Sequence, residues 1–162
     1  MRTTILGLGN TLLGDEGFGV FFLQKLVDKY DFPETVQLVD GGTLGYGLLD
    51  TISACERLLV IDIIKSGDRP GSLYRFTRAE MELRLPPPTS AHEVEFLDVL
   101  YKAEMMGRLP ETVFLCITPE KYGGQMEIGL TPAMYEAFPA MEKIFFQQLS
   151  HWQLTVQAKK SA

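Results

Sequence analysis

Thr3-Thr4-Ile5-Leu6-Gly7-Leu8-Gly9-Asn10 is a short apolar run that stops at a glycine and an asparagine. Such a run, bounded by turn residues, is typical of a buried strand that leaves into a tight loop. From Glu16 to Tyr30, apolar residues then recur at the spacing of one helix face. A strand followed directly by an amphipathic helix is the first half of a β-α-β unit.

The same pattern continues after this first unit. Val36–Val39 and Leu58–Ile61 are predicted to be strands, with a short helix at about Tyr46–Ser53 between them. Strands that alternate with helices pair in parallel through right-handed crossovers. Leu58–Ile61 is continuously apolar, so we expect it in the middle of the sheet.

The pattern changes after the third strand. Only the short loop Lys65–Pro70 precedes the next predicted strand, Ser72–Phe76. That connection is too short for a parallel crossover, so Ser72–Phe76 should run antiparallel at an edge. With Val113–Ile117 as the fifth strand, the sequence predicts an α/β domain with a mostly parallel five-stranded sheet and one antiparallel edge strand.

The rest of the chain supplies the remaining connections. A long loop, Thr77–Thr89, should carry the chain back across the sheet to a helix from about Ala91 to Met106, with Ser90 as N-cap and Glu93 at the capping-box position. A last helix should run from Thr131-Pro132 to about Leu149. We expect one domain over residues 1–162, with a core at 2–149 and a C-terminal tail at 150–162.

Composition narrows the classes of function. The chain has 162 residues, 46% of them hydrophobic, a formal net charge of −6 and a pI of about 4.9. No basic cluster suggests nucleic acid, and an acidic surface disfavours anionic membranes. Cys55 and Cys116 lie in apolar surroundings without a CxxC pattern, so we expect buried small side chains. No signal-peptide pattern and no apolar run of about 18 residues is present, which makes a cytoplasmic protein the expectation.

Four polar residues follow the predicted strand ends. Glu16 comes after the first strand, Asp40 ends the second, Asp62 ends the third, and His92 starts the helix that leads into the last. Ligands of open, mostly parallel sheets bind beyond the carboxyl ends of the strands. We therefore expect two carboxylates and an imidazole to meet at one edge, with a third carboxylate nearby.

An imidazole and two carboxylates form a mixed nitrogen and oxygen ligand set. Such a set suits a divalent metal such as zinc or nickel and leaves positions open for water or substrate. Each residue also has a structural explanation. An acid in a first helical turn is favoured by the helix dipole, as for Glu16, and Asp40 and Asp62 can cap turns. Their joint position at one edge favours function. His151, near the end of the last helix, is assigned no role.

Other chemistries find little support in the sequence. Gly7-Leu8-Gly9-Asn10 lacks the third glycine of a dinucleotide fingerprint, because Leu12 stands there, and it lacks the P-loop lysine. We expect Asn10 and the glycines to form a tight turn that brings backbone close to a bound group. Neither a G-x-S-x-G motif nor a cysteine paired with a suitable histidine supports a covalent nucleophile.

An ordered set of motifs resembles the nickel–iron hydrogenase maturation endopeptidases. The motifs are Gly7-x-Gly9-Asn10-x-Leu12-x-x-Asp15-Glu16-x-x-Gly19-Val20, Asp40-Gly41-Gly42-Thr43, Val60-Ile61-Asp62, Ser90-x-His92, Ile117-Thr118-Pro119-Glu120 and Gly129-Leu130-Thr131-Pro132. Each motif alone is weak, but the set runs in order from about Arg2 to Leu149. The resemblance implies a single α/β domain, with a twisted five-stranded sheet and helices on both faces. It also implies an enzyme that is often classed with aspartic-type peptidases.

The resemblance also implies roles for particular residues. Glu16, Asp62 and His92 match metal ligands through which catalysis would occur, and Asp40, Gly41, Gly42 and Thr43 match a substrate-recognition segment. The implied reaction removes a C-terminal extension from the large-subunit precursor once nickel is inserted. The nickel belongs to the substrate, and zinc or cadmium would fit the site in vitro. The Lys121–Glu127 segment varies among such proteins and is expected to shape the choice of partner.

Two rival functions share features with this sequence. Peptidyl-tRNA hydrolases also begin with a Gly-Leu-Gly-Asn stretch, but here Thr11-Leu12 replaces the expected proline and glycine, no histidine precedes His92, and the charge is wrong for RNA. A nickel-sensing chaperone that docks on the same precursor without cutting it would use the same ligands. The sequence leaves this second alternative open.

Overall fold

The computed structural model describes residues 1–42, 44–84 and 91–161, without the side chains of residues 83, 84, 91 and 92. Thr43, Ser90 and most of the proline-rich segment before Ser90 therefore lie outside the described residues. The elements in chain order are β1 (Thr3–Leu8), η1 (Gly14–Gly17), α1 (Phe18–Lys29), β2 (Tyr30–Asp31), β3 (Val36–Gly42), η2 (Gly45–Leu48), α2 (Leu49–Ser53), β4 (Arg57–Ile63), β5 (Leu73–Thr77), α3 (Arg78–Arg84), α4 (Ala91–Met105), β6 (Glu111–Ile117), α5 (Pro132–Glu136), α6 (Phe138–His151) and β7 (Gln157–Ala158).

The central sheet has five strands in the order β3-β1-β4-β6-β5. The pairs β1–β3, β1–β4 and β4–β6 are parallel, and β5 runs antiparallel to β6 at the edge. This confirms the predicted topology. It also confirms the predicted position of the continuously apolar strand, because β4 is the middle strand and Leu58 to Ile61 are fully buried.

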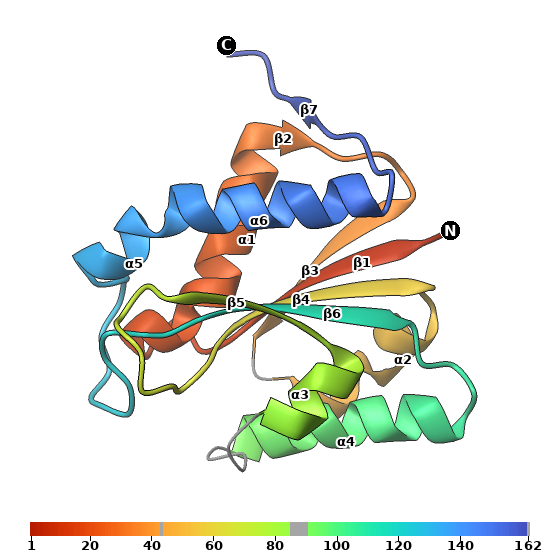
Figure 1. Ribbon diagram of the computed structural model, residues 1–162, viewed down its shortest axis with the longest axis horizontal. Helices are drawn as coiled ribbons and strands as arrows, with labels where there is room; N and C mark the ends of the chain where they lie inside the picture. The colour runs from red at the N-terminus through yellow and green to blue at the C-terminus, as the bar shows by residue number, and fades with distance from the viewer. Residues whose placement is uncertain (43, 85–90, 162) are drawn as a thin grey trace.

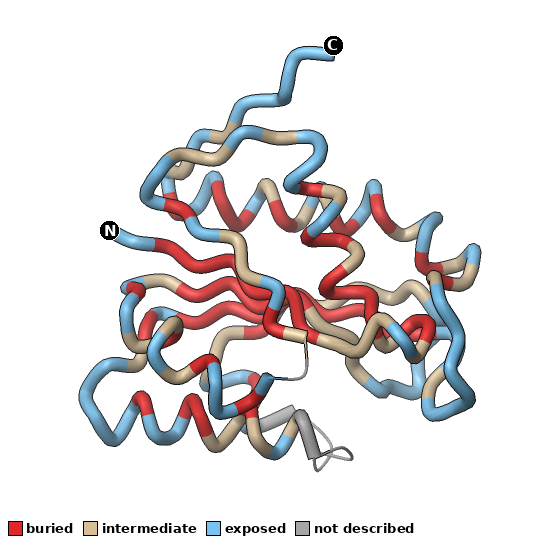
Figure 2. The backbone as a smooth tube through the Cα atoms, turned by 180° about the vertical axis from the view of Figure 1, so that it is seen from behind, coloured by how far each residue is buried: buried red, intermediate tan, exposed pale blue. Residues whose placement is uncertain are grey.

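Helices cover both faces of the sheet, as predicted. α1, α5 and α6 lie on one face, and α2, α3 and α4 lie on the other (Figure 1). Each face has its own core. One is built on aromatic residues such as Phe18, Phe22 and Phe145, and the other includes Phe96 and Phe114. Figure 2 shows the buried residues along the strands and on the inner sides of the helices.

One predicted loop is a helix. The segment expected to be the long loop Thr77–Thr89 contains α3, which begins directly after β5. The Thr77 backbone N–H donates to Glu80 Oε2 at 2.8 Å, and the Glu80 N–H donates to Thr77 Oγ1 at 3.4 Å. This reciprocal pair is a capping box, which satisfies backbone donors that a helix start leaves unpaired.

Two predicted helices differ from expectation in a similar way. The segment from Glu16 to Tyr30 is a short 3₁₀ turn, η1, followed by α1. The last helix is divided into α5 and α6 at Ala137, with Pro139 in the first turn of α6. Proline has no backbone N–H and excludes the preceding turn sterically, so one continuous helix cannot pass through this point.

The region predicted to be a tail is partly ordered. α6 continues to His151, and β7 pairs antiparallel with β2. Cys55 and Cys116 are free and buried, as predicted. In the described part of the chain, no helix is long and apolar enough to cross a membrane.

Candidate functional site

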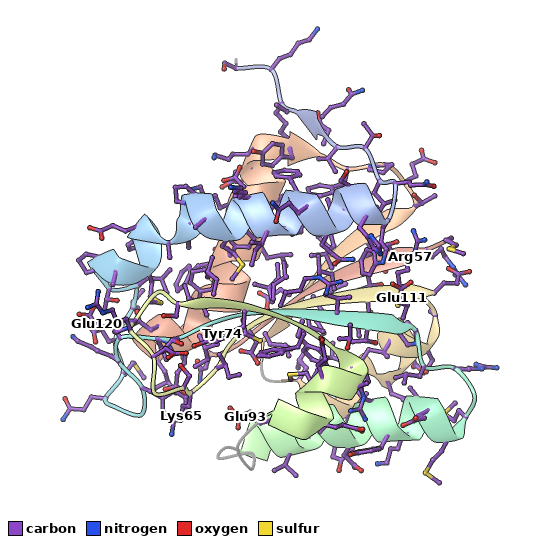
Figure 3. All side chains as sticks on the ribbon, in the orientation of Figure 1. Arg57, Lys65, Tyr74, Glu93, Glu111 and Glu120 are labelled. Carbon is purple, nitrogen blue, oxygen red and sulfur yellow. The ribbon has the colours of Figure 1, made fainter. Side chains whose placement is uncertain are left out.

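The carboxyl edge of the sheet holds the predicted site residues. Glu16 lies in η1, directly after the loop that leaves β1, and Asp62 is the penultimate residue of β4. His92 belongs to the first turn of α4, but its side chain is outside the described part. Figure 3 places Lys65, Glu93 and Glu120 toward this edge of the sheet and Arg57 and Glu111 at the opposite end. The two predicted carboxylates are therefore at one edge, and the position of the imidazole stays a prediction.

Close backbone packing positions Glu16. Gly9 has φ = 128°, and a Cβ on it would lie 1.9 Å from the Glu16 carbonyl oxygen. Any larger residue would push η1 away from the end of β1. Asn10 Oδ1 accepts the Leu12 N–H at 3.0 Å and fixes the turn between them. Asn10 and the glycines thus form the predicted tight turn, which packs closely on η1, and a bound group beside it stays a prediction.

Asp62 is a half-buried carboxyl whose pKa is raised from 3.8 to about 7. Burial is the main cause, and the negative charges of Glu93 and Glu16 add to it, whereas the Ile63 N–H, which donates to Asp62 Oδ1 at 2.7 Å, opposes it. Burial disfavours the charged form, and nearby anions disfavour it further. Asp62 therefore changes its charge close to neutral pH.

Cys116 is the neighbour of Asp62 on β6, because the two residues are partners in the strand register. Burial, and then the charge of Asp62, raises the pKa of the Cys116 thiol well above its usual range. A thiol that keeps its proton is a poor nucleophile. Cys116 is therefore poorly suited to act as a nucleophile at this site.

Glu93 is a further acid at this site that sequence reasoning missed. We interpreted Glu93 only as the capping-box residue of its helix, but its charge acts on Asp62 together with that of Glu16. The side chain is half buried near the start of α4 (Figure 3). The available signal was its place directly after His92, which puts it in the helical turn that faces the sheet edge.

Asp15 is the second missed residue, although it stands in the quoted motif. Its side chain is 1% exposed and accepts four hydrogen bonds. Oδ2 accepts from the backbone N–H groups of Glu120 and Lys121 at 3.1 and 3.0 Å and from the Thr131 hydroxyl at 3.0 Å. Oδ1 accepts the Thr131 N–H at 2.8 Å. A single carboxylate therefore joins η1 to both ends of the segment that follows β6.

That segment, residues 120–131, covers η1 and is called the β6–α5 loop below. The Gly14 N–H donates to the Glu127 carbonyl at 2.7 Å, and the Glu127 N–H donates to the Leu12 carbonyl at 2.9 Å. The Gly123 N–H donates to Glu16 Oε2 at 3.3 Å. A surface cavity of about 600 Å³ lies between this loop and residues 13–15. Its lining includes Asp15 but neither Glu16 nor Asp62.

The segment predicted to recognise substrate lies farther along the same edge. Asp40 and Gly41 are inside β3, not after its end as expected, because pairing with β1 continues through a register shift to Gly42. Asp40 is exposed, and its Oδ1 accepts the Gly42 N–H at 2.9 Å. β1 separates β3 from β4, so the backbones at Asp40 and Asp62 are about 10 Å apart at the usual strand spacing. Asp40 is therefore beside the acid pair and not part of it.

A complete set of metal ligands is not formed by the described side chains alone. Among them, no three His, Cys, Asp or Glu residues come together in a metal-binding group. The acids Glu16, Asp62 and Glu93 interact electrostatically, and the backbone of His92 is next to that of Glu93. Carboxylate oxygens of this kind can hold a divalent ion once an imidazole nitrogen joins them. The predicted ligand set stays a prediction that the positions of Glu16 and Asp62 permit.

Comparison with known proteins identifies the family. The family model described as hydrogenase maturation protease (HycI) matches residues 20–148. The chain is 32% identical to the hydrogenase expression/formation protein HupD of Bradyrhizobium diazoefficiens, covering 99% of this chain and 84% of that protein. It is 34% identical to the hydrogenase 2 maturation protease of Escherichia coli, covering 89% and 88%. The structure of the hydrogenase maturating endopeptidase HybD from E. coli superposes with a TM-score of 0.91 at 27% identity, covering 98% of both chains. The chain therefore belongs to the hydrogenase maturation proteases, a family of endopeptidases.

Proposed function

We propose that this protease removes the C-terminal extension from the large-subunit precursor of a nickel–iron hydrogenase after nickel has been inserted. The similar E. coli proteins are named for hydrogenase maturation, which supports a hydrogenase precursor as the substrate. A precursor that acquires its metal inside the cell would meet the protease in the cytoplasm. Neither nucleic acid nor membrane has a part in this proposal.

The observation that carries the proposal is a half-buried acid with other acids near it at the carboxyl edge of the sheet. Burial of Asp62 raises its pKa to about 7, and repulsion by the negative charges of Glu93 and Glu16 adds to this. A divalent cation placed between Glu16 and Asp62 would remove that repulsion and displace the proton. We assign the third ligand to His92, in the first turn of α4. The nickel of the precursor would be this cation, and zinc or cadmium would replace it in vitro.

Peptide hydrolysis at this site needs an activated water molecule. Asp62 can accept a proton from that water as a general base, or the metal can lower the pKa of the water. The chain contains no pair of Asp-Thr-Gly motifs, so a pepsin-like pair of catalytic aspartates has no support in its sequence. In both routes Glu16, Asp62 and His92 would hold the nickel, and the nickel would place the scissile bond next to them.

The test uses the purified protein and purified precursor, loaded with nickel or free of it. We expect the large subunit to lose the mass of its C-terminal extension only when nickel is present. The mass of the intact large subunit over time is the measurement. Cleavage of nickel-free precursor at the same rate would refute the recognition of nickel.

The same experiment decides between a protease and the nickel-sensing chaperone. A chaperone would form a stable complex with nickel-loaded precursor, and the large subunit would keep its full mass. The acid pair alone serves either function. Membership of a protease family favours cleavage, so we expect the mass loss.

A further inference from the structure

The buried carboxylate of Asp15 accepts hydrogen bonds from four donors. Three backbone N–H groups and one hydroxyl point at its two oxygens, and the side chain is 1% exposed. Only a group that accepts at both oxygens satisfies all four donors, which an ionised carboxylate does and an amide does not. Hydrogen bonds to a charged acceptor are also about twice as strong as neutral ones.

The donors on Asp15 connect it to Glu16 through the β6–α5 loop. Glu120 and Lys121 bind Asp15 through their backbone N–H groups. Two residues after Lys121, the Gly123 N–H donates to Glu16 Oε2 at 3.3 Å. The other end of the loop is held by Thr131, which binds Asp15 through both its N–H and its hydroxyl. The loop that holds the Glu16 carboxylate is thus itself held by the residue next to Glu16.

We infer that Asp15 is a positioning residue, which sets the place of the Glu16 carboxylate by anchoring the β6–α5 loop over η1. All four hydrogen bonds that Asp15 accepts come from the β6–α5 loop. Asp15 acts through Gly123, whose N–H orients the proposed ligand. The part of this inference that concerns catalysis rests on the proposed function, and the part that concerns metal binding does not.

The charge of Asp15 lies close to other negative charges. The fold places a second anion beside Glu16, at an edge that already carries Asp62 and Glu93. Nearby like charges disfavour one another, but the four hydrogen bonds to Asp15 stabilise its carboxylate at this edge. An anchor that also orients a ligand must be rigid, and four donors on one carboxylate supply that rigidity. Residues that orient a metal ligand typically change the metal affinity by about 10- to 100-fold when they are removed.

The main test compares Asp15→Asn with Asp28→Asn, which is the same change at an exposed position of α1. In the full-length protein we expect Asp15→Asn to speed hydrogen exchange at the amides of Glu120, Lys121 and Gly123 by at least about tenfold. We expect its dissociation constant for zinc, measured by calorimetry, to rise about 10- to 100-fold. Its kcat/KM on nickel-loaded precursor should fall in parallel, whereas Asp28→Asn should behave like wild type in all three measurements.

A milder pair of variants covers the case in which Asp15→Asn does not fold. Thr131→Val removes only the hydroxyl that donates to Asp15, and Thr131→Ser keeps it. Loss of one hydrogen bond corresponds to about a fivefold change. We expect Thr131→Val to weaken zinc binding by about that factor and Thr131→Ser to restore it.

Two results would overturn the inference. One is zinc affinity in Asp15→Asn equal to that of Asp28→Asn, which would leave Asp15 with a structural role only. The other, if Asp15→Asn is unfolded, is equal zinc affinity in Thr131→Val and Thr131→Ser. If wild type binds zinc but never shortens the precursor, the proposed function fails while the zinc and exchange measurements still decide the role of Asp15.

Discussion

Asp15 and Asp62 are two aspartates at the same edge of the sheet with opposite surroundings. Asp15, in η1, is fully buried and accepts four hydrogen bonds. Asp62, at the end of β4, is half buried, accepts the N–H of the next residue, and is close to the charges of Glu93 and Glu16. The pKa of Asp62 rises to about 7, and burial is its first cause.

The two surroundings give the two aspartates different roles, one in holding the chain and one in binding a cation or a proton. Donors that satisfy a buried carboxylate stabilise it as an ion and fix the chain around it. Few donors and neighbouring anions leave a carboxylate that gains from a cation or a proton. The η1 side of the site is therefore the rigid side, and the β4 end is where a metal would make the largest difference.

Neutralising Asp62 is expected to have the largest effect on processing. Asp62→Asn keeps the shape of the side chain but removes a metal ligand or a general base. We expect processing of nickel-loaded precursor to slow at least about 100-fold. The measurement is the rate at which the intact large-subunit mass disappears, with the exposed variant Asp28→Asn as control. Processing of wild-type speed in Asp62→Asn would remove Asp62 from the mechanism.

The third proposed ligand gives a similar but more ambiguous effect. His92→Ala should slow processing at least about 100-fold, because an imidazole ligand would be lost from the metal. The fold should persist, since a residue at the sheet edge contributes little to the core. Circular dichroism and the same mass measurement check the two statements. An unfolded His92→Ala would favour a structural role for the residue, and normal processing would exclude it as a ligand.

Asp15 should matter more for stability than Asp62. Asp15→Asn cannot accept at both oxygens, so at least one buried donor loses its partner. We expect the free energy of unfolding to fall by about 2–3 kcal/mol. Urea unfolding of the metal-free protein measures this, with Asp28→Asn as reference. A loss below about 0.5 kcal/mol, the size typical of surface substitutions, would show that the four hydrogen bonds do not anchor the loop.

Asp62→Asn should instead raise the free energy of unfolding, and the size of this effect should depend on pH. Its pKa in the folded state, about 7, is above the reference value of 3.8, so between these values the folded state holds a proton that the unfolded state has lost. The stability due to this proton is present at low pH and is lost as pH rises toward 7. Asp62→Asn has no such loss, and at pH 8 it should be more stable than wild type by about 1–2 kcal/mol after allowance for relaxation of the site.

The measurement is urea unfolding of wild type and Asp62→Asn from pH 4 to pH 8 in a chelator. The difference between the two proteins should be small at about pH 4, grow as the pH approaches 7, and level off above it. Adding zinc should abolish the advantage of the variant, because the ion stabilises only the wild-type carboxylate. A difference that stays constant over the whole range would contradict the raised pKa of Asp62.

The smallest effect is expected at Asp40. Asp40→Asn keeps an oxygen that can accept the Gly42 N–H, so stability should change by less than about 0.5 kcal/mol. If Asp40 recognises the precursor, KM should rise several-fold with little change in kcat. Steady-state processing kinetics measure both constants. A large fall in kcat would place Asp40 inside the reaction centre, in conflict with its position two strands from β4.

The sheet could be predicted because its signals are local. Loop length alone predicted the direction of β5, since the short connection Lys65–Pro70 cannot hold a crossover. The continuously apolar sequence Leu58–Ile61 predicted the central place of β4, and the burial of these residues confirms it. The pairing of β2 with β7 could not be predicted, because each strand has two residues and they lie far apart in the chain.

The sequence contains signals for α3 and for the break between α5 and α6, although both predictions were wrong. Thr77 and Glu80 have the spacing of a capping box, and the residues after them are good helix formers, yet the segment was interpreted as loop because prolines follow. Pro139 is a sequence signal for the break between α5 and α6.

In the site, strand-end logic found Glu16 and Asp62 but overlooked Asp15 and Glu93. Asp15 is next to Glu16 in the sequence, and Glu93 is next to His92. Their importance depends on what packs against them: the β6–α5 loop for Asp15 and the end of β4 for Glu93. No pattern within either short motif encodes those tertiary contacts.

A crystal structure of the protein with zinc or cadmium bound would test the proposed metal site directly. We expect one ion at the carboxyl edge of the sheet, held by oxygens of Glu16 and Asp62 and by a ring nitrogen of His92, with zinc–nitrogen and zinc–oxygen distances of about 2.0–2.2 Å. An ion bound elsewhere, or a His92 imidazole directed away from the two carboxylates, would contradict it.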